Sequence, residues 1–254
     1  MSKVELNFQG KTALVTGASR GIGEAVARAL AANGAEVILT SRKLEDLKYI
    51  ADDIVKAGGK ATALSCHVGE IEQINQLFES IRKKFSKLDI LINNAATNPF
   101  FGDVLSADER VWDKTFAVNL KGLFFLSQHA AKMMKTTGGG AILNVASVNA
   151  IRPAPFQSIY SITKAGIIAL TLSFAKELAP FNIRVNALLP GLTDTKFASA
   201  LTQSPEIMKM VLPTIPMGRI AKPAEMAGAV LYLVSDTASY TTGACLNVDG
   251  GMLA

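Results

Sequence analysis

The chain has 254 residues, of which 49% are hydrophobic and 19% charged, and its formal net charge is +5. This composition supports one large or two small packed domains and excludes a disordered chain. No apolar run reaches the roughly 18 residues of a membrane helix and the first ten residues lack a signal peptide's apolar core, so we expect a soluble cytoplasmic protein.

Short β-branched runs alternate along the chain with longer segments of helical period, a pattern typical of a parallel sheet with helices on both faces. We predict strands at 12–16, 36–40, 62–66, 90–93, 141–146, 184–188 and 245–248. We predict helices at 21–33, 43–56, 70–85, 111–135, 158–179 and 224–234. The predicted fold is a single α/β domain over 1–254, a Rossmann-type doubly wound sheet of seven parallel strands. Residues 193–217 contain several prolines and fit neither element type; we favour a substrate lid, and an ordinary surface loop is the alternative.

A glycine-rich turn, Thr16-Gly17-Ala18-Ser19-Arg20-Gly21-Ile22-Gly23, joins the first predicted strand to the first helix. Glycines let the backbone turn tightly and approach a pyrophosphate, while the N–H groups at the helix start face the anion. A glycine-rich turn alone is often only a tight connection, but its position here favours a dinucleotide site.

The turn resembles the fingerprint of the short-chain dehydrogenase/reductase family, Thr-Gly-x-x-x-Gly-x-Gly. Asn93-Asn94-Ala95-Ala96, Asn119 and Pro190-Gly191 with Thr195 also match elements of that family, and the resemblance covers nearly the whole chain. The predicted cofactor site consists of Gly17, Ser19, Arg20, Gly21, Ile22, Gly23, Ser41, Arg42, His67, Val68, Asn94, Ala95, Tyr160, Lys164, Pro190, Gly191, Thr193 and Thr195.

The segment after the second strand predicts which cofactor binds. It is Thr40-Ser41-Arg42, without the acidic residue that would hold a ribose 2′-hydroxyl. Arg42 and Arg20 suit a 2′-phosphate, so we predict NADP(H); the alternative is that both arginines are only solvated.

Two residues depart from the family pattern. His67 precedes Val68 where an aspartate usually reaches the adenine, so that contact is expected from backbone groups or from His67, and Ala96 replaces a glycine.

Three residues carry the predicted chemistry. Ser147 follows a strand, and Tyr160 precedes Lys164 by four residues, which places both on one helix face. Reduction of a carbonyl requires a proton donor beside the oxygen and a second donor that polarises it. Tyr160 suits the first role if its pKa falls from about 10 toward 7, which Lys164 and an oxidised nicotinamide can cause. The resemblance further implies that Lys164 holds the nicotinamide ribose, that Ser147 bonds the substrate oxygen, and that Asn119 positions a water in a proton relay.

The surroundings predict a hydrophobic carbonyl substrate. Mostly apolar candidates for the pocket are Asn98, Phe100, Asn149, Phe156, Leu192 and Phe197. The segment 98–102 with 111–114 resembles the NADP-dependent carbonyl and retinol reductases, although Phe100 and Phe101 are also ordinary packing residues. A 3-oxoacyl-thioester reductase is the alternative within the fold, and a non-catalytic NADP(H)-sensing module is the alternative from another class.

Partners are predicted from charge and surplus apolar surface. Basic residues are dispersed among acidic ones, so we expect neither nucleic acid nor membrane partners, and two cysteines and two histidines without ligand spacing predict no metal site. Helices 111–135 and 158–179 are apolar on more than one face, and the resemblance implies pairing of these helices in a homotetramer; burial within one subunit is the alternative.

Overall fold

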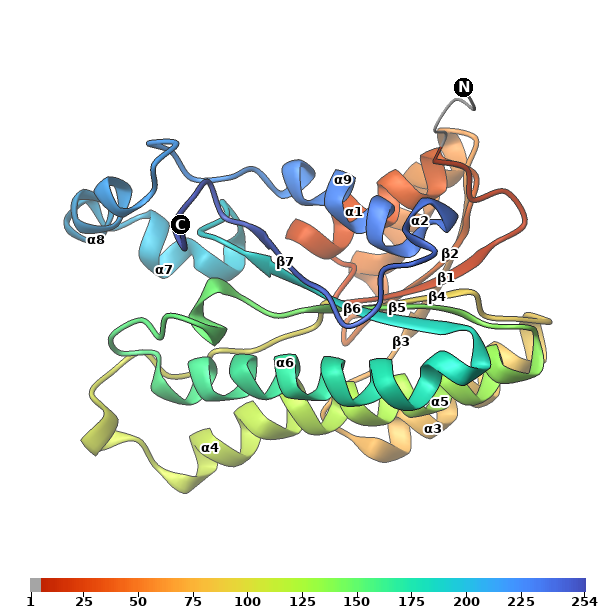
Figure 1. Cartoon of the computed structure of the whole chain (residues 1–254), viewed down its shortest axis with the longest axis horizontal. Coiled ribbons are helices and arrows are strands. Elements are labelled where there is room, and N and C mark those ends of the chain that lie inside the picture. Colours follow the sequence, from red (N-terminus) through yellow and green to blue (C-terminus); the bar gives the residue numbers. More distant parts are fainter. Residues whose placement is uncertain (1–5) are drawn as a thin grey trace.

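Parallel strands form the centre of the computed structural model, which describes residues 6–254 (Figure 1). Over this range they form one seven-stranded sheet in the order β3-β2-β1-β4-β5-β6-β7. The strands are β1 Thr12–Thr16, β2 Glu36–Ser41, β3 Lys60–Ser65, β4 Ile90–Asn93, β5 Gly140–Val145, β6 Ile183–Pro190 and β7 Cys245–Val248. The predicted Rossmann-type fold is therefore confirmed, with strand ends shifted by one or two residues.

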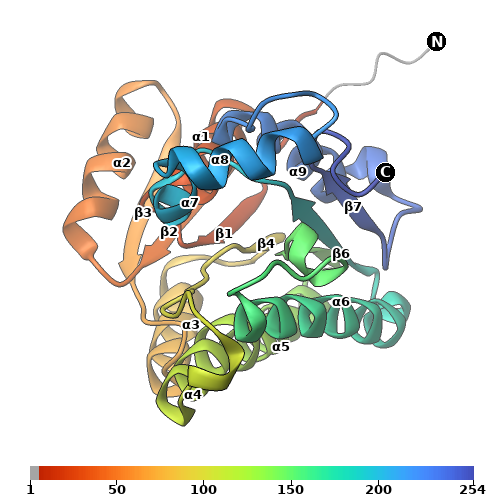
Figure 2. The same ribbon diagram turned by 90° about the vertical axis from the view of Figure 1, so that its left-hand side faces the viewer.

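Two layers of helices cover the sheet, as Figures 1 and 2 both show. One layer contains α1 Gly21–Ala32, α2 Leu44–Lys56 and α9 Ala227–Val234. The other contains α3 Ile71–Lys84, α4 Glu109–Phe116, α5 Gly122–Thr136 and α6 Ser158–Leu178. Each layer closes its own apolar core: Leu30 and Val230 are buried on the first face, and Phe78 and Leu126 on the second. Burial on both faces explains why the central strands are almost continuously apolar.

The prediction of one helix over 111–135 is wrong at its middle. A π-helical turn, Ala117–Lys121, separates α4 from α5. Directly after it, Gly122 lies so close to the Val68 carbonyl that a Cβ would collide with it. Periodicity does not reveal such a turn, because it adds a single residue to an otherwise continuous helical pattern. The turn matters for the site, since it holds Asn119.

The segment after β6 lies at the end of the molecule drawn on the left of Figure 1. It folds into two short helices, α7 Ser199–Thr202 and α8 Pro205–Val211, which Figure 2 shows beyond the strand ends on the side of α1 and α9. The predicted lid at 193–217 is therefore a helical segment. Its closure stays a prediction.

By length and composition, the segment Ser158–Phe181 is long and apolar enough to cross a membrane, contrary to the expectation that no such run exists. It lies along the sheet as α6, with Tyr160 and Lys164 buried. The prediction about a signal peptide concerns the first ten residues, and of these Met1–Glu5 lie outside the described residues.

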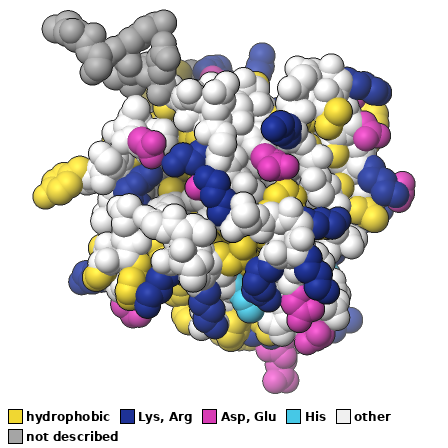
Figure 3. All heavy atoms as spheres, turned by 90° about the vertical axis from the view of Figure 1, so that its right-hand side faces the viewer, with side chains coloured by type: hydrophobic (Ala, Val, Ile, Leu, Met, Phe, Trp, Pro, Cys, Tyr) yellow, Lys and Arg dark blue, Asp and Glu magenta, His cyan; other side chains and the backbone are white. Residues whose placement is uncertain are grey.

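Figure 3 shows the end of the molecule opposite α7 and α8. Lysine and arginine side chains there are interspersed with acidic and apolar ones. This face therefore carries no continuous basic surface.

Candidate active site

A cavity of about 700 Å³ opens beyond the carboxyl ends of the strands. Open parallel sheets bind ligands at this edge. Most of the predicted site residues line it, namely Gly17, Ser19, Arg20, Gly21, Ile22, Ser41, Arg42, His67, Val68, Asn94, Ala95, Asn98, Ser147, Asn149, Phe156, Tyr160, Lys164, Pro190, Gly191, Leu192, Thr193, Thr195 and Phe197. Gly23, Phe100 and Asn119 do not line it.

The glycine turn leaves no room for a side chain at Gly17 or at Gly23. Gly17 has a φ of 64°, and a Cβ built on it would lie 2.8 Å from Asn94 Nδ2. A Cβ on Gly23 would collide with the same nitrogen and with the Gly17 carbonyl. Gly23 is therefore a packing residue of the turn, whereas the start of α1 is left bare toward the cavity. This cradle fits the pyrophosphate of a dinucleotide.

Asn94 fixes this turn to the end of β4. Its Nδ2 donates to the carbonyls of Thr16 and Gly17 at 3.0 and 3.2 Å. In return, Thr16 Oγ1 accepts from the amides of Asn94 and Ala95, both at 3.0 Å. The Asn94 side chain thus shapes the cradle instead of pointing a free amide at a ligand.

Two arginines lie at the edge of the cavity. Arg20 immediately precedes α1, and Arg42 immediately follows β2; both are exposed and line the cavity. The cavity edge here offers two guanidinium groups and no carboxylate, as the sequence predicts. Guanidinium groups match the geometry of phosphate oxygens.

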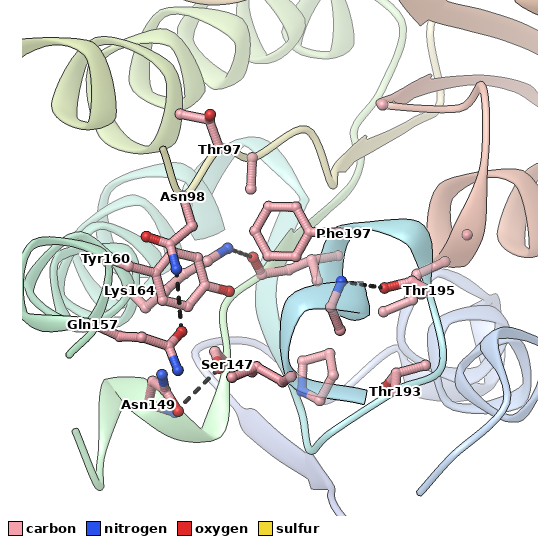
Figure 4. A pocket seen from close by; sticks show the side chains of 18 of the residues that line it. Thr97, Asn98, Ser147, Asn149, Gln157, Tyr160, Lys164, Thr193, Thr195 and Phe197 are labelled. Atoms are coloured by element: carbon pink, nitrogen blue, oxygen red, sulfur yellow. Dashed lines mark hydrogen bonds between the residues drawn. The ribbon is translucent and has the colours of Figure 1, made fainter. Parts of the chain in front are cut away.

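Ser147, Tyr160 and Lys164 meet in the part of the cavity shown in Figure 4. Ser147 follows β5, and its Oγ accepts from the Asn149 amide at 3.1 Å, which leaves the hydroxyl proton available. Lys164 Nζ donates to the Val145 carbonyl at 2.7 Å and lies 5.4 Å from the centre of the Tyr160 ring. The predicted trio is therefore assembled by one strand end and one helix face.

Burial shifts the pKa of both titratable members. It raises the pKa of Tyr160 to about 12, and the adjacent Ser147 hydroxyl partly opposes this rise. It lowers the pKa of Lys164 to about 7. Burial alone therefore favours the neutral phenol. The lowered pKa of Tyr160 expected from Lys164 together with an oxidised nicotinamide stays a prediction.

Three side-chain hydrogen bonds hold Asn119. It is buried in the π-helical turn, where Oδ1 accepts from the Thr97 amide at 2.8 Å. Its Nδ2 donates to the Thr97 carbonyl at 2.9 Å and to Thr163 Oγ1 at 3.1 Å. These bonds join the loop after β4 to α6, and the predicted role of Asn119 in positioning a water stays a prediction.

Aromatic rings form the outer part of the cavity, with one correction. Phe101 lines it instead of Phe100, whose ring packs over Gly102. Neighbouring residues of an extended segment point to opposite sides, so a shift by one residue exchanges them. The ring centres of Phe101 and Phe156 are 5.8 Å apart, and those of Phe197 and Tyr160 are 5.9 Å apart. Phe156 has an unusual positive φ of 63°.

Several cavity residues were missed from the sequence. Gln157 precedes Tyr160 by one helical turn and accepts from Asn98 Nδ2 at 3.2 Å (Figure 4), so the spacing could have identified it. A further group comes from the lid segment and the chain end: Leu201, Ile207, Met210, Val211 and Met252. Their positions depend on how α7 and α8 fold back over the cavity, which local pattern does not encode.

The fold and this site define an NAD(P)-dependent oxidoreductase that acts on CH–OH groups. The chain belongs to the short-chain dehydrogenase/reductase family. Residues 17–253 match the sequence family described as Enoyl-(Acyl carrier protein) reductase.

Three relatives illustrate this membership. The chain is 39% identical to Dehydrogenase/reductase SDR family member 4 of Homo sapiens, over 95% of this chain and 87% of the relative. It is 40% identical to 3-oxoacyl-[acyl-carrier-protein] reductase of Aquifex aeolicus, over 98% of this chain and 100% of the relative. A solved structure from Agrobacterium tumefaciens, described as a 2-deoxy-d-gluconate 3-dehydrogenase with bound NADP, has a TM-score of 0.91 at 37% identity and covers 99% of both chains.

Proposed function

We propose that this protein uses NADPH to reduce the carbonyl group of hydrophobic ketones, aldehydes or dicarbonyl compounds, and oxidises the matching alcohols in reverse. The observation that carries the proposal is the Ser147, Tyr160 and Lys164 trio at the inner end of a cavity walled by Phe101, Phe156 and Phe197. Apolar walls with a few convergent polar groups are typical of sites for apolar small molecules.

Each polar group has a distinct task in this proposal. The cofactor, when bound along the glycine turn, supplies the hydride. The Ser147 hydroxyl donates to the carbonyl oxygen, because a carbonyl oxygen can only accept, and the Asn149 amide orients Ser147 Oγ. Tyr160, which burial keeps protonated, gives its proton to the oxygen as negative charge develops there. Lys164 in its charged form stabilises the phenolate that remains.

We propose NADP(H) as the cofactor. Support comes from Arg20 and Arg42 at the cavity edge and from the bound NADP of the Agrobacterium structure. The glycine cradle accommodates either nicotinamide dinucleotide, so the preference rests on the arginines.

A second candidate within the same family is a 3-oxoacyl-thioester reductase, favoured by the similarity to the Aquifex aeolicus enzyme. The non-catalytic sensing module is disfavoured, because a module that only binds needs neither the buried Tyr160 nor the buried Lys164.

The test is NADPH consumption, followed by absorbance, against a panel of aromatic ketones, α-dicarbonyls and acetoacetyl thioesters. We expect turnover of the first two groups and a loss of about 10²- to 10⁴-fold in Tyr160→Phe with NADPH binding retained. Tyr240→Phe is the control, because Tyr240 is fully exposed. Exclusive turnover of the thioesters establishes the second candidate instead, and residual activity of Tyr160→Phe near the wild-type level refutes the proton donor.

A further inference from the structure

His67 lies at the end of the cavity where the base of a dinucleotide has to bind. Ser41 of β2 pairs in register with Ser65 of β3, so Arg42 and His67 follow neighbouring strand ends, and both line the cavity. A dinucleotide with its pyrophosphate at the start of α1 and its ribose beside Arg42 extends its base beyond these ends. Cys66 and Val68 line the same part.

Two hydrogen bonds hold His67 in one orientation. Its backbone amide donates to Gln73 Oε1 at 2.8 Å. Its ring nitrogen Nδ1 accepts from the Gly69 amide at 3.1 Å. The ring also packs over Gly69, since a Cβ there would lie 2.9 Å from the ring carbon Cε1. The ring is therefore fixed by its surroundings before any ligand binds.

The bond to Nδ1 decides which proton the ring carries. A nitrogen that accepts from an amide has no hydrogen of its own, so in the neutral imidazole the proton is on Nε2. His67 consequently presents a donor to the cavity. A carboxylate at this position would present acceptors only.

Adenine offers both kinds of group: its 6-amino group is a donor, and its ring nitrogens are acceptors. We propose that His67 reverses the hydrogen-bond polarity of the adenine site, donating through Nε2 to a ring nitrogen and leaving the 6-amino group without an acceptor at this position. The inference rests on the proposed use of NADP(H). Its consequence is that the protein tolerates a dinucleotide whose purine lacks the 6-amino group.

Asparagine and aspartate provide a matched pair of variants. In both His67→Asn and His67→Asp, one side-chain oxygen can replace Nδ1 as acceptor for the Gly69 amide, as in an Asx turn. The remaining group is then an NH₂ donor in His67→Asn and a carboxylate acceptor in His67→Asp. The two variants differ in polarity and hardly in size.

The experiment measures Kd by fluorescence titration for NADPH and for its purine analogue, in which hydrogen replaces the 6-amino group. We expect the two ligands to bind wild type and His67→Asn with equal Kd, and the analogue to bind His67→Asp about 5- to 10-fold more weakly than NADPH, the worth of one hydrogen bond. Discrimination by wild type of fivefold or more, or equal ratios in the two variants, overturns the proposal.

Two further measurements separate this inference from the cofactor preference. If NADPH does not bind, the same comparison is made with NADH and its purine analogue, since the base site is common to both. If His67→Asp does not fold, ¹⁵N spectra of the wild-type histidines decide, with His67→Asn assigning the signal by its loss. A neutral ring protonated on Nε2 is expected, and one protonated on Nδ1 contradicts the proposal.

Discussion

Single residues set the chemistry of this site through their burial. Lys164 is only 2% exposed, with Val145 as hydrogen-bond acceptor, so the protein holds an amine where its charged form is disfavoured. Tyr160 is buried beside it and held in its neutral form. Burial thus keeps Tyr160 neutral and brings the pKa of Lys164 close to neutral pH, and such shifts are common where titratable groups serve catalysis.

The lowered pKa of the buried Lys164 predicts how the stability of the protein depends on pH. Its folded pKa of about 7 lies below the unfolded value near 10.4, so between these values the unfolded chain binds more protons. The free energy of unfolding without ligand should therefore rise with pH from 7 to 10, by up to about 4 kcal/mol from this one group. Lys164→Met should remove that part of the rise.

Urea unfolding at several pH values measures this, with Lys176→Met, on an outward position of the same helix, as the control. Equal pH slopes for wild type and Lys164→Met would show that Lys164 stays charged in the fold.

The two arginines support a prediction about cofactor choice. Loss of Arg20 and Arg42 together removes two guanidinium groups from a 2′-phosphate and leaves the glycine cradle intact. We expect the Kd for NADPH to rise about 10²- to 10⁴-fold in the double alanine variant while the Kd for NADH stays constant, since charge-assisted bonds are each worth about 1.5 to 3 kcal/mol. Titration of both cofactors measures this. Arg110→Ala, a highly exposed position on α4, is the control, and a parallel loss for both cofactors would argue against a 2′-phosphate contact.

At the scale of elements, β1, α1 and β4 pack closely together around Gly23. Gly23→Ala introduces a methyl group against the Gly17 carbonyl, which cannot move without opening the turn. We expect a loss of at least about 2 kcal/mol in unfolding free energy and a weakened NADPH complex. Gly228→Ala in α9 is the matched control: nothing lies within 4 Å of its Cβ position, so the change should stabilise by up to about 1 kcal/mol. Similar effects of both changes on urea unfolding would contradict this packing argument.

The same scale shows what the sequence could and could not predict. The seven parallel strands, the glycine turn and the placement of Tyr160 and Lys164 on one helix face follow from local pattern and spacing, and the structure contains all three. The π-helical turn, the exchange of Phe101 for Phe100 and the bonded amide of Asn119 were not foreseen. Each depends on a contact between segments far apart in the chain, such as Gly122 against Val68 or Asn119 against Thr163, which periodicity does not record.

For the whole molecule, the outward faces of α5 and α6 predict an assembly. Phe124, Ile162 and Leu172 are each 40% exposed or more, beyond what the second core buries. We propose that these helices pair in a homotetramer, and we expect sedimentation velocity to show a tetramer that dissociates in the double variant Phe124→Glu and Leu172→Glu. Tyr49→Glu is the control, because it places the same charge on an exposed aromatic residue of α2, on the other side of the sheet. A monomeric wild type would disprove the assembly.

A series of hydrogen bonds and short backbone segments connects the glycine turn to the backbone of Tyr160. Thr16 is bound to Asn94 and Ala95, Thr97 two residues later is bound to Asn119, Asn119 to Thr163, and Thr163 Oγ1 donates to the Tyr160 carbonyl at 2.7 Å. α7, α8 and the residues before α6 lie outside this series. Substitutions in those outer segments can therefore change which molecules fit the cavity without breaking the bonds that hold the backbone around the reacting groups.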